Sequence, residues 1–155
     1  MDPIPDGALE AAAGLWRAHF GICGWPARIR ARHGMVAISG GAVLGVIGLR
    51  DTEGGFPLRD LAAPRWLFRC APETSDLVID GLAVSRPRQG IATALVTSAL
   101  GRAARQAHPG LRAEVRAQNP QALAFYRSLG FVEEGCGCYG LPWWGQIHIL
   151  RRDAA

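Results

Sequence analysis

Residues 119–131 read NPQALAFYRSLGF and contain a complete helix together with its start and stop signals. Asn119 stands at the N-cap position and Pro120 at the first helical position, where proline's missing N–H costs no hydrogen bond. Gly130 fits the C-cap, so the pattern predicts a helix over residues 120–129 followed by a returning strand. Tyr126 falls near the end of this helix, where a tyrosine ordinarily packs its ring and keeps its hydroxyl at the rim.

The sequence on either side of this run predicts further strands and helices. The residues before it alternate between apolar and charged, which is typical of a strand with two different faces. A Gly40–Gly41 pair joins two apolar runs into a hairpin whose strands are expected to be buried on both faces. The fold class is therefore α/β or α+β, a sheet with helices packed on it. Strands are predicted over residues 35–39, 43–49, 77–84, 111–117, 131–138 and 145–150, and helices over residues 7–20 and 91–108.

Two segments fit this alternation less well. Residues 28–32 carry three arginines, which indicates either a solvent-exposed face or a short helix. Residues 51–75 open with a glycine-rich turn and continue with apolar residues at helical spacing. We expect this segment to be a helical insertion between two strands that shapes a substrate pocket or an oligomer contact. No internal repeat divides the chain, so residues 1–155 are expected to form one domain.

The strongest local sign of chemistry is a strand that leads through a glycine-containing loop into a helix start, residues 82–93. The first turn of a helix leaves N–H groups unpaired and carries a partial positive charge, which favours an anion. Gly90 and Ala92 permit close approach to the backbone, and Arg86 and Arg88 add charge. The segment predicts a phosphate-containing ligand; the alternative is a helix start that is rich in small residues without function. Because the lysine of a P-loop is missing, that motif is excluded.

Together, the two segments closely resemble the GNAT superfamily of acetyl-CoA-dependent N-acetyltransferases. Residues 119–131 fit that family's Asn-x-x-Ala-x-x-Phe-Tyr-x-x-x-Gly-Phe pattern at every fixed position. The loop matches the family's pyrophosphate-binding pattern at Gly90 and Ala92, while Pro87 stands where Gln or Arg is expected. The resemblance covers residues 35–150, and the family's first strand is not evident before Gly7.

The resemblance implies a mixed, mostly antiparallel central sheet flanked by helices, in which two parallel strands splay apart at the cofactor site. It implies acetyl-CoA as the co-substrate and direct attack of a primary amine on the thioester. The backbone of Leu82 and Val84 would pair with the pantetheine amides, and Tyr126 would protonate the leaving thiolate. The cofactor-binding residues that the resemblance implies are Leu82, Ala83, Val84, Arg88, Gln89, Gly90, Ile91, Ala92, Thr93 and Asn119.

Direct attack needs a base that removes a proton from the acceptor ammonium. Asp80 is the first candidate, because it lies on the strand before the loop, four residues before Val84 and on the same face. A carboxylate in an apolar run invites a raised pKa, but a structural aspartate bonded to the backbone would explain the pattern nearly as well. The runners-up are Glu73, Asp76, Glu114 and His148.

Cys136 and Cys138 lie two residues apart on one predicted strand, with His148 on the next. A zinc site needs about four ligands, so small core residues are favoured over a metal site or a cysteine nucleophile, and no metal is expected. The chain's 4 cysteines are too few for the disulfide framework of a secreted protein. The acidic start of the sequence lacks the features of a signal peptide, so we expect a cytoplasmic protein without a membrane span.

The formal net charge of +4 comes from 17 arginines against 13 acidic residues, with no lysine in the sequence. Catalysis by lysine is therefore excluded. The expected acceptor is a small-molecule amine or a peptide amino terminus; nucleic acid is not expected, because no arginine run is interleaved with aromatics. Three options stay open: a macromolecular acceptor such as aminoacyl-tRNA, a non-catalytic CoA-binding or regulatory domain, and a homodimer.

Overall fold

Extended, largely apolar segments of the chain join into a seven-stranded sheet. The computed structural model describes residues 1–20, 28–58 and 67–155. Within these ranges the strand order is β2-β3-β6-β7-β9-β8, β4 pairs with the end of β3, and β1 and β5 form a separate pair. The elements are α1 (Asp6–Phe20), β1 (Arg28–Ile29), η1 (Ala31–His33), β2 (Gly34–Ser39), β3 (Ala42–Asp51), β4 (Gly54–Gly55), β5 (Pro57–Leu58), β6 (Leu77–Val84), α2 (Ile91–Arg105), β7 (Gly110–Arg116), α3 (Pro120–Ser128), β8 (Val132–Cys138), η3 (Pro142–Trp144) and β9 (Gln146–Asp153).

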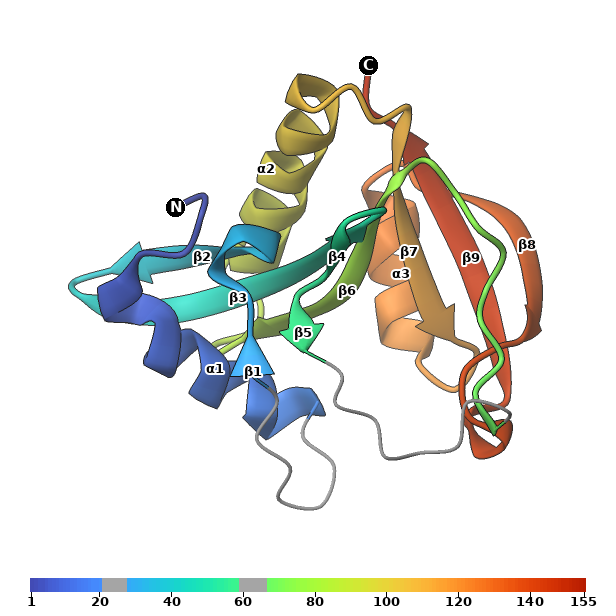
Figure 1. The fold of residues 1–155 in the computed structure, drawn as a ribbon, viewed down its shortest axis with the longest axis horizontal. Coiled ribbons are helices and arrows are strands. Elements are labelled where there is room, and N and C mark those ends of the chain that lie inside the picture. The colour runs from blue at the N-terminus through green and yellow to red at the C-terminus, as the bar shows by residue number, and fades with distance from the viewer. Residues whose placement is uncertain (21–27, 59–66) are drawn as a thin grey trace.

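The sheet buries apolar side chains on both faces. Adjacent residues of a strand point to opposite faces, so Met35 joins the core beneath α2 and α3, whereas Val36 joins the core on the α1 side. Ile47 and Val46 on β3 divide in the same way. In Figure 1, α2 lies above β2 and β3 and α1 lies below them. The prediction that the first hairpin is buried on both faces is confirmed.

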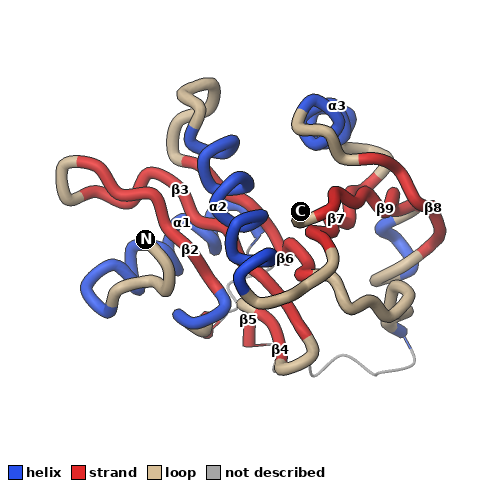
Figure 2. The backbone as a smooth tube through the Cα atoms, turned by 90° about the horizontal axis from the view of Figure 1, so that it is seen from above, coloured by secondary structure: helices blue, strands red, loops and turns tan. Residues whose placement is uncertain are grey.

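Strands β6 and β7 are the sheet's parallel pair, and they stay together for only part of their length. Leu77, Val78 and Ile79 pair with Leu111, Arg112 and Ala113, and no pairing follows. Beyond that point, and among the described strands, β6 stays paired with β3 and β7 with β9. Figure 1 shows the two strands together at their upper ends and divergent below, and Figure 2 shows β2, β3 and β6 grouped apart from β7, β9 and β8. The predicted mostly antiparallel sheet with splayed parallel strands is confirmed.

A register shift on β6 lies at the point where β6 and β7 part. Leu49 of β3 pairs with Ile79, but its neighbour Gly48 pairs with Gly81, so Asp80 is an extra residue without a partner across the ladder. Such a β-bulge bends a strand and re-aims a side chain. The bulge therefore separates the two strands and directs the Asp80 side chain at the same place.

The helix predicted over residues 7–20 is α1, and the run at 119–131 forms α3 with the expected cap. The helix predicted over 91–108 is α2, but it ends at Arg105. Ala107 takes a left-handed φ of 59°, which ends the helical path of the backbone. The His108 ring, 2.8 Å from the Ser75 carbonyl oxygen, lies beyond that turn. The last strand is longer than predicted and reaches Asp153, because β7 pairs with it along its whole length.

The segments with weak patterns differ most from expectation. The arginine-rich stretch at 28–32 is not an α-helix: it forms β1 and the start of η1. In the insertion at 51–75, the expected glycine-rich turn is β4, paired with β3, and Leu58 belongs to β5 rather than to a helix. Most of the predicted helix falls on residues 59–66, which lie outside the described residues. The end of the insertion, residues 67–76, runs extended in front of β7 and β9 (Figure 1).

Two smaller expectations are also decided. The prediction that Cys136 and Cys138 are small core residues is wrong. Both are exposed, because β8 is an edge strand whose faces are covered by few other residues.

No strand precedes α1 among the described residues, but the Met1 backbone carbonyl accepts a hydrogen bond from the Val36 N–H (3.1 Å) along the edge of β2. No described helix has the length and apolar character needed to cross a bilayer.

Candidate functional site

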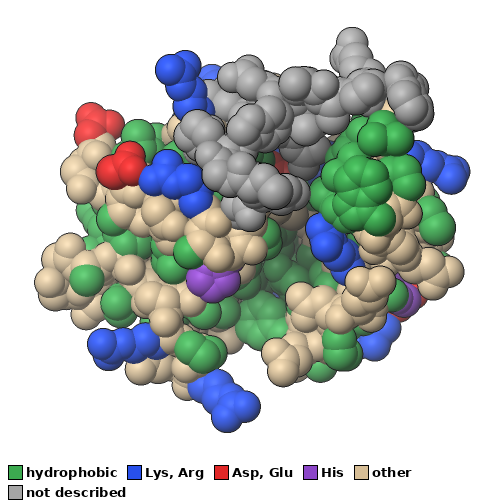
Figure 3. Space-filling view, turned by 90° about the horizontal axis from the view of Figure 1, so that it is seen from below, with side chains coloured by type: hydrophobic (Ala, Val, Ile, Leu, Met, Phe, Trp, Pro, Cys, Tyr) green, Lys and Arg blue, Asp and Glu red, His purple; other side chains and the backbone are tan. Residues whose placement is uncertain are grey.

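The opening between β6 and β7 exposes one edge of β6. The Ser85 N–H donates to the Leu44 carbonyl of β3 at 2.9 Å. Because the residues of an antiparallel strand alternate in the direction of their backbone groups, Ala83 also points its groups toward β3, whereas Leu82 and Val84 point theirs toward the opening. Seen from the end where the strands diverge, the surface is hollowed, with hydrophobic side chains at its floor (Figure 3). The opening thus offers unpaired amides to an extended ligand.

The loop after β6 leads these amides into the start of α2. Arg88 and Gly90 take left-handed φ values of 64° and 73°, an arrangement that turns successive N–H groups toward one side. A left-handed conformation at a residue other than glycine costs on the order of 1–3 kcal/mol and is found mainly at functional sites. The first bond of α2 runs from the Ala94 N–H to the Gly90 carbonyl, which leaves the N–H groups of Ile91, Ala92 and Thr93 without a helical acceptor.

Space for a ligand exists at this helix start. No atom lies within 4 Å of the position that a Cβ on Gly90 would occupy. Residues 85–90 are all exposed, including Pro87, which departs from the expected sequence pattern, and both neighbouring arginines. Arg86 and Arg88 have no carboxylate partner among the described residues. The N–H groups, the positive end of the helix and the two guanidinium groups together create surroundings that favour an anion.

Tyr126 and Asn119 come to the same side of the sheet through α3. The Asn119 side-chain oxygen accepts a hydrogen bond from the Ala122 N–H (3.1 Å), which caps α3 and leaves the side-chain NH₂ group exposed. The Tyr126 ring is buried between Phe125 and Phe131, each 5.2 Å away between ring centroids. Leu82 packs against the same core, so Tyr126 is part of the cluster that lines β6.

The Tyr126 hydroxyl stays protonated. Burial of the ring raises the pKa of Tyr126 well above its ordinary value. The hydroxyl makes no hydrogen bond with a described residue, and its oxygen is not fully enclosed by protein atoms. It is therefore a neutral O–H donor with some access to solvent, which is the state required of a general acid.

Asp80 lies on the face of the sheet opposite to Tyr126, beside Gly55 and Phe56, whereas Val84 lies on the α2 side. The predicted shared face of Asp80 and Val84 is therefore wrong, because the bulge at Asp80 shifts the alternation of β6.

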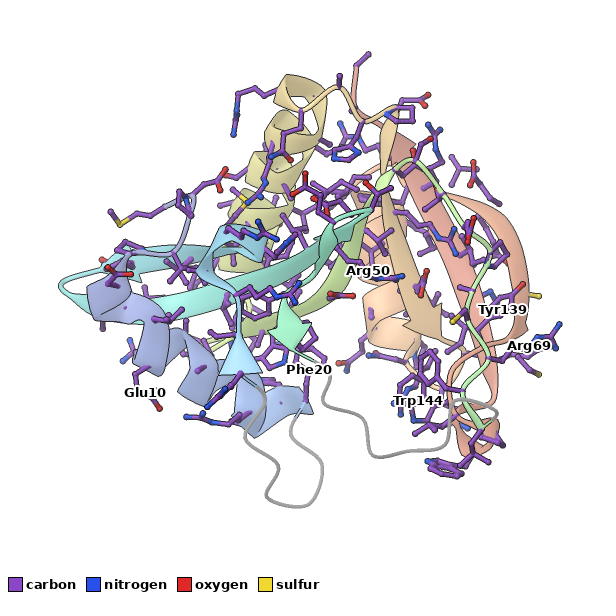
Figure 4. All side chains as sticks on the ribbon, in the orientation of Figure 1. Glu10, Phe20, Arg50, Arg69, Tyr139 and Trp144 are labelled. Carbon is purple, nitrogen blue, oxygen red and sulfur yellow. The ribbon has the colours of Figure 1, made fainter. Side chains whose placement is uncertain are left out.

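The Asp80 Oδ1 accepts a hydrogen bond from Arg50 Nε (3.0 Å) and its Oδ2 accepts one from the Phe56 N–H (3.1 Å). Only 3% of its side chain is exposed. Figure 4 shows Arg50 between the two diverging halves of the sheet. These contacts hold the bulge of β6 against β3 and β4, and they leave Asp80 little freedom to accept a proton.

Glu114 is the first residue of β7 beyond the parallel pairing, so it stands at the edge of the opening. Its Oε1 accepts a hydrogen bond from Arg50 Nη2 (3.3 Å) and lies 2.9 Å from Arg112 Nη2. Its Oε2 has no partner among the described residues, and 22% of the side chain is exposed. Burial acts to lower the pKa of Arg50, but the charges of Asp80 and Glu114 outweigh it and raise that pKa.

The other candidate bases are less well placed. Glu73 is exposed on the segment that covers β7. Asp76 is buried at the closed end of the strand pair and accepts hydrogen bonds from Thr74 and Arg151. His148 lies 2.9 Å from Glu133 on β8, away from the opening. Among the described residues no group of three or more His, Cys, Asp or Glu side chains could hold a metal ion.

Sequence reasoning missed Arg50. It links three strands, because it bonds Asp80 on β6 and Glu114 on β7 from its own place on β3. The signal that could have found it is a single arginine at the end of an apolar strand, matched by a single aspartate inside another apolar strand. Opposite charges at such positions are buried only when they are paired.

The sequence matches the model of the Acetyltransferase (GNAT) family over residues 8–131. A comparison with curated proteins found no match. Among solved structures, the fold is similar to Ard1 from Thermoplasma volcanium, with 20% identity and a TM-score of 0.67 over 97% of this chain and 94% of that chain. It is similar to the ribosomal-protein-S18-alanine N-acetyltransferase from Escherichia coli, with 16% identity and a TM-score of 0.63 over 99% and 92% of the two chains.

A third similar structure is that of NAA60 from Arabidopsis thaliana in complex with acetyl-CoA, with 16% identity and a TM-score of 0.61 over 97% of this chain and 96% of that chain. At these identities the likeness to solved structures shows the fold. The predicted family and the predicted arrangement of the sheet are both confirmed by these comparisons.

Proposed function

Because the chain belongs to the acetyltransferase (GNAT) family, we propose that it transfers an acetyl group from acetyl-CoA to a primary amine. One observation carries the proposal: β6 and β7 part after three paired residues, and the free edge of β6 leads directly into an anion-binding helix start. An extended ligand with amides at one end and a pyrophosphate at the other matches this order of groups. The residues present therefore fit acetyl-CoA.

The proposed binding roles follow from the backbone. Leu82 and Val84 would pair with the pantetheine amides as an added strand, while Ala83 turns its backbone groups to β3. The N–H groups from Gln89 to Thr93 would hold the pyrophosphate, with Arg88 and Arg86 supplying charge. The exposed NH₂ group of Asn119 would donate to the cofactor from the start of α3. Acetyl-CoA supplies the activated thioester, and the protein supplies position and proton transfer.

Tyr126 is proposed as the general acid. As the amine nitrogen forms a bond to the carbonyl carbon and the carbon–sulfur bond breaks, the Tyr126 hydroxyl donates its proton to the leaving sulfur. Burial raises the pKa of the phenol, so the hydroxyl still carries its proton at neutral pH when the thiolate forms beside it. The attacking nitrogen releases its surplus proton to solvent as the amide forms, and solvent returns a proton to Tyr126.

The acceptor ammonium must lose a proton before it attacks. Asp80, the first candidate from the sequence, remains a prediction, but both of its oxygens already accept hydrogen bonds. We propose Glu114 as the stronger candidate, because its Oε2 is free of described partners at the edge of the opening. Arg50 bonds to both carboxylates, so it positions Glu114 and neutralises Asp80 beside it.

The test measures thiol release from acetyl-CoA with a panel of small primary amines and peptides. The expected result is turnover with at least one amine, reduced about 100-fold in kcat by Tyr126→Phe with unchanged affinity for acetyl-CoA. The matched control, measured with the small amines alone, is Tyr139→Phe, since Tyr139 is the other tyrosine in the sequence. Binding of acetyl-CoA without turnover of any amine would make the protein a non-catalytic CoA-binding domain. Full turnover by Tyr126→Phe would remove Tyr126 as the acid.

A further inference from the structure

Two arginines lie over aromatic rings near the C-terminal end of β7. The Arg116 Cζ lies 4.4 Å from the centroid of the Trp144 ring, and the Arg69 Cζ lies 5.8 Å from the centroid of the Tyr139 ring. Trp144 also meets Phe68 edge to face, with 5.9 Å between ring centroids. We call the group the arginine–aromatic patch; its members are Arg69, Arg116, Tyr139, Trp143 and Trp144.

The patch faces solvent beside the opening. Trp143 is 67% exposed, and both arginines are exposed. Figure 3 shows a gathering of hydrophobic side chains next to the central hollow, with arginine side chains beside it. Figure 4 shows Trp144 nearer to the opening and Arg69 with Tyr139 farther out, toward the outer edge of the sheet. A ligand that leaves the opening on this side would cross Trp144 before it reached Arg69.

The two patch arginines lack a carboxylate partner among the described residues. Nearby arginines are mostly paired with carboxylates: Arg112 with Glu114, Arg127 with Glu133 and Arg151 with Asp76. Arg152 donates instead to the Leu129 carbonyl oxygen. Stacking on a ring fixes the plane of a guanidinium group but leaves its N–H edge free to donate. Residues 139–145 and 67–72 contain no acidic residue that could occupy that edge.

The spacing along β7 relates the patch to the reaction. Arg116 lies two residues after Glu114, so both side chains emerge on the same face, about 6.6 Å apart along the strand. With the two side chains extended from these positions, an amine held at Glu114 and a carboxylate held at Arg116 would be separated by roughly the length of two residues. The amine and carboxylate of one free amino acid are too close together to span this distance.

We propose that the acceptor is the amino terminus of a polypeptide with acidic side chains at its second and third positions. The inference rests on the proposed function and names the substrate class of the same site. Arg116 holds the first carboxylate and Arg69 the next, while Trp144 and Trp143 contact the chain between them. The charge is complementary, because the patch offers two unpaired cations and two apolar rings.

A nucleic acid fits the patch less well. Binding to a polyanion relies on many basic side chains arranged along a stripe, and affinity then falls steeply with salt. The patch has two guanidinium groups, separated by aromatic rings. A short acidic segment needs only these two contacts.

The experiment compares three peptides that share an amino-terminal alanine and differ at positions two and three: Asp-Glu, the matched amides Asn-Gln, and Lys-Arg. Their kcat/KM values are measured by thiol release from acetyl-CoA. The expected order is Asp-Glu above Asn-Gln above Lys-Arg, with about a tenfold difference between the first two. Arg116→Gln should reduce this preference to nearly none, and Arg69→Gln should reduce it less, since Arg69 lies farther from the opening.

Arg105→Gln is the matched control, because Arg105 is an exposed arginine at the far end of α2. It should keep the full preference for the acidic peptide.

Equal rates with all three peptides, or a preference that survives Arg116→Gln, would overturn the inference while the proposed function stands. Turnover of small amines without turnover of any peptide would also overturn it. No turnover of any amine would instead overturn the proposed function. A steeply salt-dependent inhibition by a single-stranded oligoribonucleotide, without discrimination among the peptides, would assign the patch to nucleic acid.

Discussion

The two faces of β7 are both covered along much of their length, yet one is apolar and the other is charged. Leu111, Ala113 and Val115 are 0–6% exposed and pack beneath α2 and α3. On the other face, Arg112 and Glu114 lie under residues 67–76 and connect to Arg50. A single strand can therefore stabilise the fold through apolar packing on one face and position charged groups at the edge of the site on the other.

The largest expected effect comes from the apolar face. Leu111→Ala removes a fully buried side chain from the core and should lower the free energy of unfolding by about 2–5 kcal/mol. Thermal or urea denaturation measures this loss. Glu114→Gln, on the charged face of the same strand, should lose about 1 kcal/mol, because glutamine still accepts from an arginine. Equal losses of unfolding free energy in the two variants would show that the two faces of β7 contribute equally to stability.

The apolar face was readable from the sequence. Strict alternation at 111–117 predicted which residues of β7 face the helices, and the run at 119–131 carried the cap, the helix and the stop of α3 within itself. These features depend on residues that are neighbours in the chain. The local sequence pattern is enough to predict which residues are buried where the hydrophobic periodicity alone determines the packing.

The charged face should control turnover rather than stability. Glu114→Gln should lower kcat about 100-fold, because the glutamine amide cannot accept the acceptor's proton. Asp80→Asn should chiefly lower stability, since it removes a charge from the pair with Arg50 and sets an amide against the Phe56 N–H. The two variants are compared by kcat at saturating substrates and by denaturation.

The opposite pattern would reverse the assignment of the base. If Asp80→Asn loses turnover while its fold stays intact, and Glu114→Gln keeps it, the first prediction from the sequence is the correct one. Arg105→Gln, remote from both carboxylates, should change neither quantity.

The charged face was not readable from the sequence, because it depends on contacts between distant residues. The bulge that re-aims Asp80 exists only in the pairing of β6 with β3. The link from Arg50 to Glu114 joins residues 64 positions apart. The exposure of Cys136 depends on β8 being an edge strand, and Gly54 and Gly55 form a strand only because β3 lies beside them. Periodicity contains none of this information.

His33 gives a smaller test of buried charge. It is 2% exposed, neither ring nitrogen has a hydrogen-bond partner among the described residues, and the nearest carboxylate oxygen, of Asp51, is 3.9 Å away. Burial, assisted by neighbouring arginines, lowers the pKa of His33 and outweighs Asp51, so the folded protein binds a proton at this ring more weakly than the unfolded chain does. As pH falls below about 6.5, the unfolded chain binds a proton at His33 more readily than the folded protein does. The free energy of unfolding therefore decreases.

Denaturation of the wild type and His33→Leu at pH 7 and pH 5 measures this linkage. The wild type should lose about 1 kcal/mol more than the variant over this interval, since one group contributes at most about 1.4 kcal/mol per pH unit. Parallel losses in both proteins would show that folding does not lower the pKa of His33.

The affinity of acetyl-CoA for two glycine variants, measured by calorimetry, tests the central claim most directly. Gly90 and Gly41 have similar left-handed φ values, 73° and 79°, and open space where a Cβ would stand, so alanine strains the backbone alike at both. Only Gly90 begins the helix proposed to hold the pyrophosphate. The account predicts that the wild type and Gly41→Ala bind acetyl-CoA equally and that Gly90→Ala binds it about tenfold more weakly. Equal binding by both variants, or no binding by the wild type, would contradict it.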